Sequence, residues 1–307
     1  MSKPALILAP SNLGLRPAED GGQQGAWQAP EVLMQAGLAA ALRPVAVTNL
    51  GRPLYRFDAQ PGTRIRNGNA IKDYAIRMAE PVRSALTSDQ MPVVIGGDCS
   101  ILLGCLYGAR LAGAKGLIHI DGHSDFFHPG NYDTDSRLGS VAGMDLALAT
   151  GRGEPLLTQW PGIEGPLVED ADAAQVGERE SLLPDFHDIY ADVVSTPIQR
   201  HIIQSVLAAG IPATLTSLTD WMASRDLHWA WLHVDFDVLD QSELPAVDSP
   251  GSPGLTFAQL RSLVEGLLRS GRIAGACFTI YDPQRDPDRR YAGPLVELIA
   301  GAIRSVI

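Results

Sequence analysis

The chain has 307 residues, of which 45% are hydrophobic and 19% are charged, so it can bury a core of the size that one α/β domain needs. Its formal net charge of −11 argues against a nucleic-acid partner, because binding to a phosphate backbone requires a basic surface. The same charge is compatible with a small cationic substrate. No uncharged apolar run reaches the ~18 residues of a membrane span, so we expect no membrane partner either.

The cysteines and the N-terminus indicate the cellular compartment of the protein. The chain has three cysteines, Cys99, Cys105 and Cys277, and so small and odd a number argues against a disulfide framework. The first apolar run, residues 5–9, is too short for the hydrophobic part of a signal peptide and predicts a strand instead. Both features predict a cytoplasmic protein with reduced thiols.

Apolar runs typical of strands alternate with helix-like stretches along the whole chain. Strands are predicted at residues 5–9, 44–47, 92–95, 116–120, 172–176, 213–218, 229–236 and 274–280. Helices are predicted at residues 100–115, 197–209 and 256–269, the last with Thr256 as its N-cap. This alternation predicts a three-layer α/β fold with a mostly parallel central sheet and helices on both faces. No repeat or low-complexity linker interrupts it, so residues 1–307 are expected to form a single domain.

The first motif that could carry chemistry reads Gly-Gly-Asp-Cys-Ser at residues 96–100 and follows a predicted strand. Open α/β sheets bind their ligands at the carboxyl ends of the strands, so these side chains are candidates for a site. A glycine-rich turn in which Ser100 caps the next helix explains the same residues. From this motif alone the two interpretations are about equal.

The second motif reads His-Ile-Asp-Gly-His-Ser-Asp at residues 119–125. Residues two apart in an extended segment project to the same side, so Asp121, His123 and Asp125 would point into one site. Carboxylates crowded around an imidazole repel each other unless a cation lies among them. A solvated loop is the alternative interpretation.

The third motif, at residues 233–240, places Asp235 and Asp237 on one side at the end of a strongly apolar run. Carboxylates this close to a core strand are costly unless they are paired or bound to a metal, although helix capping or a salt bridge would also pair them. Oxygen donors with one imidazole suit Mn²⁺ better than Zn²⁺, and the number of carboxylates indicates two ions. Two such ions share a water and lower its pKa.

These motifs resemble those of the ureohydrolase family of arginases, agmatinases and formimidoylglutamases. The family has Asp-x-His-x-Asp after one strand and Asp-x-Asp-x-x-Asp after another, and this chain has both, at residues 121–125 and 235–240. Three further stretches are similar to family segments, namely residues 25–38, 172–179 and 248–256. The resemblance spans residues 5–283.

The resemblance implies a binuclear-metal hydrolase that cleaves a C–N bond of a linear guanidino or amidino compound and releases an amine. It also implies a homo-oligomer, either a trimer or a hexamer. One metal would be held by Cys99, Asp121, Asp125 and Asp235, and the other by Asp121, His123, Asp235 and Asp237. Asp125 would also be catalytic, because it would orient the activated water.

Cys99 departs from the family, which has a histidine ligand at this position. A thiolate is a softer ligand, so it weakens the preference for Mn²⁺ and admits Zn²⁺ or Ni²⁺. A cysteine here resembles the branch of the family that hydrolyses Nω-hydroxy-L-arginine to ornithine and hydroxyurea. The alternative is that Cys99 is only a small buried hydrophobic residue and that this metal is lost.

A second departure concerns proton transfer. The resemblance aligns Ala142 with a histidine that transfers protons in the family. His128, in the preceding loop, is the candidate to replace it as a catalytic residue. A weaker need for a general acid fits a better leaving group or a less basic substrate.

The third departure concerns the substrate. The resemblance aligns Ile280 with the glutamate that holds the guanidinium group, and the candidates for substrate binding in this chain are Asn131, Glu180, Asp185 and Asp282. A substrate like Nω-hydroxy-arginine is therefore expected ahead of agmatine, arginine or a guanidino acid. The competing hypothesis is a catalytically impaired relative that acts as a binding subunit.

Overall fold

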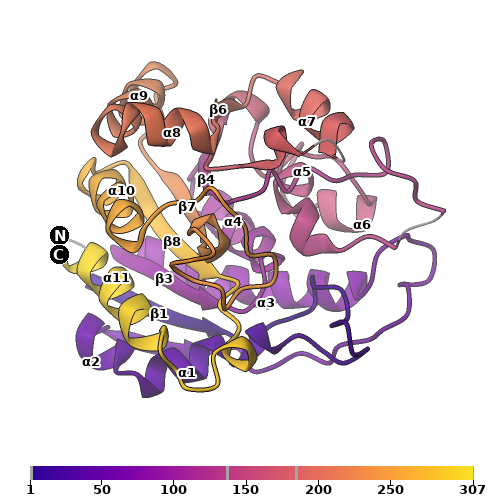
Figure 1. Cartoon of the computed structure of the whole chain (residues 1–307), viewed down its shortest axis with the longest axis horizontal. Coiled ribbons are helices and arrows are strands. Elements are labelled where there is room, and N and C mark those ends of the chain that lie inside the picture. Colours follow the sequence, from indigo (N-terminus) through magenta and orange to yellow (C-terminus); the bar gives the residue numbers. More distant parts are fainter. Residues whose placement is uncertain (1–2, 136–137, 184–185, 307) are drawn as a thin grey trace.

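The computed structural model of the chain describes residues 3–135, 138–183 and 186–306. Within these residues eight strands form one sheet, in the order β2-β1-β3-β8-β7-β4-β5-β6, and all neighbouring strands are parallel (Figure 1). The strands are β1 (Lys3–Ala9), β2 (Ala46–Asn49), β3 (Gln90–Gly96), β4 (Gly116–Ile120), β5 (Ala173–Val176), β6 (Gln199–His201), β7 (Ala230–Asp235) and β8 (Ile273–Thr279). The predicted parallel sheet is confirmed.

Helices cover both faces of the sheet (Figure 1). The helices that pack over one face are α3 (Gly68–Thr87), α4 (Ile101–Leu111), α5 (Asp145–Ala149), α6 (Pro155–Thr158) and α7 (His187–Val194). Those that pack over the other face are α1 (Ala29–Gln35), α2 (Leu38–Leu42), α8 (Ile203–Ala209), α9 (Ile211–Ser224), α10 (Phe257–Arg269) and α11 (Ala292–Arg304). None of the helices in the described part of the chain is long and apolar enough to cross a membrane.

The two faces of the sheet explain why its strands are apolar throughout. On β3, Val93 and Ile95 lie in the hydrophobic cluster under α10 and α11, whereas Val94 lies in the cluster under α3 and α4. A strand that is covered on both sides has no side that tolerates polar residues. The same pattern makes any polar residue on the central strands β3, β8, β7 and β4 a candidate for function.

One predicted strand, at residues 213–218, is wrong. These residues belong to α9, which begins at Ile211 with Pro212 in its first turn. The buried positions Ile211, Thr214, Leu218 and Met222 recur every three or four residues, as the inward side of a helix requires. The β-branched residues in the segment favoured a strand locally, but packing against α10 decides the outcome.

The predicted helix at residues 197–209 is also wrong at its start. It contains β6 (Gln199–His201), the edge strand of the sheet, and only α8 (Ile203–Ala209) is helical. A strand of three half-buried residues is too short to show an alternating pattern. The N-cap prediction for α10 is confirmed, because the Thr256 side chain accepts a hydrogen bond from the backbone N–H of Gln259 in a capping box.

The turn after β3 has no space for a side chain at Gly97. A Cβ atom there would lie 1.8 Å from the backbone oxygen of Ser11. We therefore expect Gly97→Ala to lower the free energy of unfolding by roughly 1–3 kcal/mol, because the backbone must shift to relieve the overlap. Urea unfolding of the purified variant measures this loss.

Gly293 is the matched control for this prediction. A Cβ atom at Gly293, in the first turn of α11, would have no heavy atom of the described chain within 4 Å. Gly293→Ala should leave the free energy of unfolding unchanged or raise it by up to about 1 kcal/mol, because alanine costs less backbone entropy in a helix. Equal destabilisation by both substitutions would contradict the steric explanation.

Candidate metal centre

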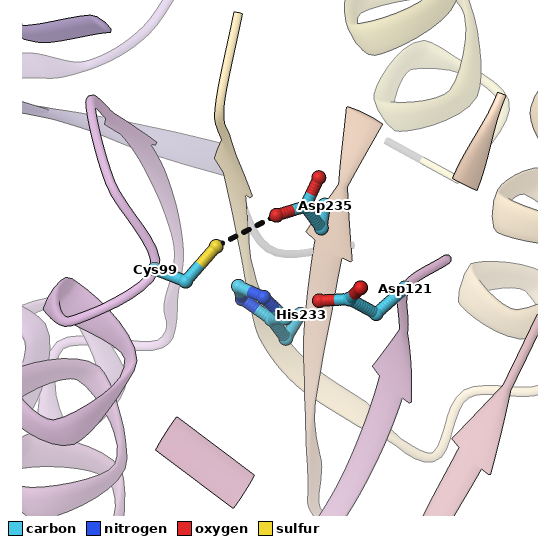
Figure 2. Close-up of side chains that lie close together, drawn as sticks. All are labelled: Cys99, Asp121, His233 and Asp235. Carbon is cyan, nitrogen blue, oxygen red and sulfur yellow. Dashed lines mark hydrogen bonds between the residues drawn. The ribbon is translucent and has the colours of Figure 1, made fainter. Parts of the chain in front are cut away.

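Three strand ends bring polar side chains together at the carboxyl edge of the sheet. Cys99 follows β3, Asp121 follows β4 and Asp235 ends β7. The Sγ atom of Cys99 lies 2.8 Å from Oδ2 of Asp235 and 3.2 Å from Oγ1 of Thr279 on β8. Figure 2 shows Cys99, Asp121 and Asp235 together with His233 around a common centre. The three motifs of the sequence therefore form one cluster.

Asp98 does not belong to this cluster. Its carboxylate accepts hydrogen bonds from the Ser11 hydroxyl at 2.8 Å and from the backbone N–H groups of Gly14 and Ser100 at 3.1 and 2.9 Å. Asp98 therefore shapes the turn after β3 and leaves Cys99 to face the cluster. Ser100 stands at the N-cap of α4, but its side chain makes no capping hydrogen bond within the described residues.

A second set of donors adjoins the first through Asp121. The Nδ1 atom of His123 lies 2.9 Å from Oδ2 of Asp237 and 3.6 Å from Oδ1 of Asp121. The Oδ1 atom of Asp237 accepts a hydrogen bond from the backbone N–H of Gly122 at 3.0 Å. Asp121 also offers an oxygen to Cys99 and Asp235, so it lies between the two sets.

Asp125 completes the arrangement from the end of the second motif. Its backbone has φ +45°, in the left-handed region that only a few residue types adopt readily, aspartate among them. One carboxylate oxygen of Asp125 lies within 4.8 Å of donor atoms of Cys99 and Asp145. Asp121 thus shares one group of donors with His123 and another with Asp125, and the convergence of all three on one site stays a prediction.

The electrostatics of the cluster fit bound cations. Burial, and then the charge of Asp237, raise the pKa of Asp121 to about 6. Burial and neighbouring carboxylates likewise raise the pKa of Asp125 and of Asp235 well above the usual range. Burial opposes ionisation of Asp237 as well, but the adjacent His123 lowers its pKa overall. Divalent ions among these oxygens would offset the cost of burying several carboxylates side by side and favour their ionised forms.

An unpaired acceptor gives a second indication of a cation. Oδ2 of Asp121 is buried and has no hydrogen-bond partner in the part of the chain that the structure describes. A buried carboxylate oxygen without a partner is costly, and a metal ion would supply the missing contact. The donor set of carboxylates, an imidazole and a thiolate therefore fits divalent metal ions.

The structure adds three buried residues that the sequence did not single out, His119, Asp145 and His233. Nε2 of His119 lies 3.0 Å from Oδ1 of Asp145, and the rings of His119 and His233 stack with centroids 4.8 Å apart. Each histidine stands two residues before a predicted ligand on the same strand, which was an available signal. Asp145 begins α5, and nothing in the sequence connects it with these strands.

A cavity of about 460 Å³ opens over the cluster. The cluster residues in its wall are Cys99, His123, Asp125, Asp235 and Asp237. Ala142 and Ile280 also line it, together with the aromatic residues Phe127, Tyr132 and Phe186. The positions at which the resemblance places a histidine and a glutamate therefore face the same space as the cluster, but they carry apolar side chains.

A family model described as the arginase family matches residues 5–303. The chain belongs to the arginase family. It is 28% identical to arginase from Bacillus caldovelox over 245 residues, which are 80% of this chain and 79% of that protein. The structure of arginase from Bacillus subtilis subsp. subtilis str. 168 has a TM-score of 0.82 at 22% identity, covering 99% of this chain and 98% of that one. Formimidoylglutamase from the same strain has a TM-score of 0.72 at 19% identity, with 99% and 87% covered.

Membership of the arginase family establishes the class of reaction. Members of the family are hydrolases that act on C–N bonds in linear amidines and depend on a binuclear metal centre. The chain has clusters of carboxylate, imidazole and thiolate donors at the place where such a centre is expected. The predictions of the family and of the enzyme class are confirmed.

His128 and Asn131 lie apart from the cavity of this arginase-family site. Nε2 of His128 lies 2.5 Å from Oδ2 of Asp192, and the His128 backbone N–H donates to Oδ1 of Asn131 at 2.9 Å. The Asn131 amide donates to the backbone oxygen of Phe126 at 2.8 Å. The loop is therefore held by its own contacts, and the catalytic role of His128 stays a prediction. Asp185 lies outside the described residues.

The other two substrate-binding candidates differ in position. Glu180 lines the cavity, and its Oε2 accepts hydrogen bonds from the backbone N–H and the hydroxyl of Ser124. Asp282 accepts hydrogen bonds from the backbone N–H groups of Gly25 and Gln284 at 3.1 and 2.8 Å. Asp282 is buried and absent from the cavity wall, and its hydrogen bonds hold two loops together. The sequence had instead indicated it as a substitute for the family glutamate that binds the substrate.

Arg179 is a cavity residue that the sequence did not single out. It is buried, and its Nη2 donates to the backbone oxygen of Asp237. Its Nε and Nη1 have no hydrogen-bond partner among the residues described. Its position at the end of residues 172–179, one of the stretches that are similar to family segments, was the signal that could have assigned it to the site.

We expect His128→Ala to lower the turnover rate by less than the about 10²–10⁴-fold that a general acid contributes. The reason is that Asp192 already occupies the Nε2 atom of His128. The metal content should not change, because neither residue lies among the clustered donors. Asp192→Ala, which removes the same contact, should cause a similar loss. A loss of more than about 100-fold in His128→Ala alone, at unchanged metal content, would establish His128 as the acid.

Proposed function

We propose that the chain hydrolyses a linear amidine whose reacting group is neutral near neutral pH, with Nω-hydroxy-L-arginine as the leading substrate. The observation that carries this proposal is the pair of apolar residues Ala142 and Ile280 in the cavity wall beside the clustered donors. A guanidinium ion next to Ile280 would lose hydration without gaining a counter-charge there. An N-hydroxylated guanidine is less basic and avoids this cost.

Two divalent metal ions are the proposed cofactor. One would be held by Cys99, Asp121, Asp125 and Asp235, and the other by Asp121, His123, Asp235 and Asp237. The oxygen-rich second set suits Mn²⁺, whereas Cys99 makes Zn²⁺ or Ni²⁺ acceptable in the first. When bound, such ions lower the pKa of a shared water and polarise the carbon that the water attacks.

The side chains of the site would divide the remaining work. Asp125, in the cavity wall among the donors, would orient the attacking water and accept its proton. Water adds to the amidine carbon, the bond from that carbon to the alkyl nitrogen breaks, and the proton goes to the departing amine. For the proposed substrate the products are ornithine and hydroxyurea.

The cavity wall also carries charges of both signs, which favour an amino acid over agmatine. Arg16 and Arg179 supply cations, and Glu180 and Asp248 supply anions. A zwitterionic end group can be bound by such a set, whereas agmatine has no carboxylate. Release of hydroxyurea and ornithine from the hydroxylated compound, measured beside urea release from arginine and agmatine, tests the proposal.

Three features of the protein as a whole are proposals as well. We expect one domain over residues 1–307, a cytoplasmic location and a homo-oligomer, either a trimer or a hexamer. The single sheet to which all the described strands belong supports the first of these. Light scattering coupled to size-exclusion chromatography measures the oligomeric state.

Bound metal should protect Cys99 from alkylation. Cys99 lines the cavity but is only 1% exposed, and burial and the charge of Asp235 raise the pKa of its thiol, so a small reagent such as iodoacetamide should label it slowly in metal-free protein. A coordinated thiolate is shielded, and labelling should therefore fall when Mn²⁺ or Zn²⁺ is added. Peptide mass spectrometry after a timed exposure measures the labelled fraction.

Cys105 and Cys277 are internal controls for this labelling. Both are buried and neither lines the cavity, so they should react only after unfolding. Equal labelling of Cys99 in metal-free and metal-loaded protein would show that Cys99 is an inert core thiol.

A further inference from the structure

His233 belongs to the first group of donors, although its position has no role in the ligand set above. Cys99, Asp121, His233 and Asp235 each offer one ligand atom, and these atoms all lie within 4.8 Å of one another. Figure 2 shows the four side chains close together at one edge of the sheet, where they come from the turn after β3, from β7 and from the end of β4. All four are at most 2% exposed.

The sheet explains how His233 reaches this centre. His233 lies two residues before Asp235 on β7, so both side chains project from the same face of the sheet. His233 stands one step deeper along the strand, beneath the carboxylates. A metal ion at the centre would thus meet a thiolate from the turn after β3, carboxylates from the ends of β4 and β7, and an imidazole from below.

The contacts of the His233 ring leave one nitrogen available. Nδ1 of His233 lies 3.1 Å from Sγ of Cys277, which also accepts a hydrogen bond from Trp231 Nε1 at 3.2 Å. Nε2, on the other side of the ring, is fully buried and has no hydrogen-bond partner within the described chain. The nearest carboxylate oxygen of Asp145 is 3.7 Å from it. A ligating imidazole needs this combination of one nitrogen held by a neighbour and one free to bind.

We propose that His233 ligates a divalent ion together with Cys99, Asp121 and Asp235. The imidazole that the family carries at position 99 would then be supplied from β7 in this chain. This inference rests on the proposed function, because it concerns one of the two metal positions. It goes further by adding a ligand that the resemblance does not contain.

The donor set that includes His233 predicts that the Cys99 position prefers Zn²⁺ or Co²⁺ to Mn²⁺. If His233 takes the place of Asp125 as the fourth ligand and Asp125 only orients the water, one sulfur, one nitrogen and two oxygens suit tetrahedral Zn²⁺ or Co²⁺, whereas Mn²⁺ prefers oxygen ligands. The position between His123 and Asp237 keeps an oxygen-rich set. We therefore expect Zn²⁺ to displace Mn²⁺ from the Cys99 position at equal concentrations, while the His123 position retains Mn²⁺.

His119 provides a matched control. It pairs in register with His233 on the adjacent strand, it is equally buried and its ring stacks on that of His233. Its Nε2, however, already lies 3.0 Å from Oδ1 of Asp145. If His233 only balanced the buried charge of Asp145, the two histidines would be equivalent. If His233 is a ligand, only His233→Gln should alter the bound ion.

The test is Co²⁺ loading of the whole protein, followed by absorption spectroscopy. The wild type should show a thiolate-to-Co²⁺ charge-transfer band that Cys99→Ser abolishes. His233→Gln should keep this band, shift the visible ligand-field bands and weaken binding at this position by about 10–100-fold or more. His119→Gln should leave the spectrum and the affinity unchanged. Circular dichroism checks that each variant folds.

X-ray absorption of the wild-type protein loaded with one equivalent of Zn²⁺ makes the test independent of any variant. One sulfur and one nitrogen neighbour of the ion would support the inference. Sulfur without nitrogen, or an unaltered spectrum in His233→Gln while two ions still bind, would overturn it and leave the proposed function intact. Failure of the wild type to bind any ion would overturn both, and the proposed function first.

Discussion

Replacing Asp235 with alanine should remove both metal ions and abolish hydrolysis. The Asp235 carboxylate contacts Cys99 on one side, at 2.8 Å, and its other oxygen accepts the backbone N–H of Asp237 at 2.6 Å. In the proposed ligand sets Asp235 belongs to both metal positions, and a neighbouring residue cannot replace a ligand that both ions share. Metal content measured by mass spectrometry after reconstitution should fall from about two ions per chain to fewer than one.

Asp240 is the control for this substitution. It is the third aspartate of the same motif, but its carboxylate accepts hydrogen bonds from the backbone N–H and hydroxyl of Ser242. Asp240→Ala should retain both ions.

Burial raises the pKa of Asp235, so its charge opposes folding in the absence of metal. Metal-free Asp235→Ala should therefore unfold at no lower temperature than the wild type. An Asp235→Ala protein that still binds two ions would contradict the bridging role.

The second large effect concerns the substrate. We expect kcat/KM for Nω-hydroxy-L-arginine to exceed that for arginine by at least about 10-fold, which is roughly 1.4 kcal/mol of transition-state stabilisation. Ala142 and Ile280 in the cavity wall can neither donate a proton nor balance a guanidinium charge. A neutral hydroxyguanidine depends less than a guanidinium ion on a proton donor and on a counter-charge in the site. Ornithine release from both compounds, measured in parallel, gives the ratio.

The double variant Ala142→His/Ile280→Glu should move this ratio toward arginine. A placed general acid contributes about 10²–10⁴-fold to rate, and a carboxylate near the guanidinium restores its counter-charge. Ile280 also has φ +76°, which is costly for a β-branched residue, so an unbranched side chain relieves strain there. Ala142→His/Ile280→Gln, which lacks the charge, should move the ratio less. If the wild type hydrolyses Nω-hydroxy-L-arginine and arginine with equal kcat/KM, the proposal of a hydroxylated substrate is wrong. The assignment to the class of hydrolases would not be affected.

The sheet was predictable because its strands have a simple signal. β3, β4 and β7 are buried and apolar apart from His119 and His233, and each ends in or just before a polar motif, so their positions and their shared edge followed from the sequence. Asp121, His123 and Asp125 follow β4 closely enough to reach the same edge, although Asp125 has φ +45° and does not continue the extended alternation. Residues 213–218 were predicted as a strand because the helix α9 depends on packing against α10, and the local sequence does not reveal this packing.

The buried residues His119, Asp145 and His233 beneath the carboxylates could not be predicted in the same way. Asp145 reaches His119 through the packing of α5 on the sheet, and residues between them in sequence give no indication of it. The contact of His128 with Asp192, 64 residues further on, could not be predicted from the loop either. Long-range pairs of this kind depend on tertiary structure, whereas the ends of the strands depend on local sequence.

A metal titration of the activity tests the central claim most directly. Metal-free protein is mixed with increasing Mn²⁺ or Zn²⁺ while release of ornithine from Nω-hydroxy-L-arginine is followed. A binuclear hydrolase should be inactive without metal and reach its full rate at about two ions per chain. Full activity without added metal, or a plateau at a single ion per chain, would contradict the binuclear account.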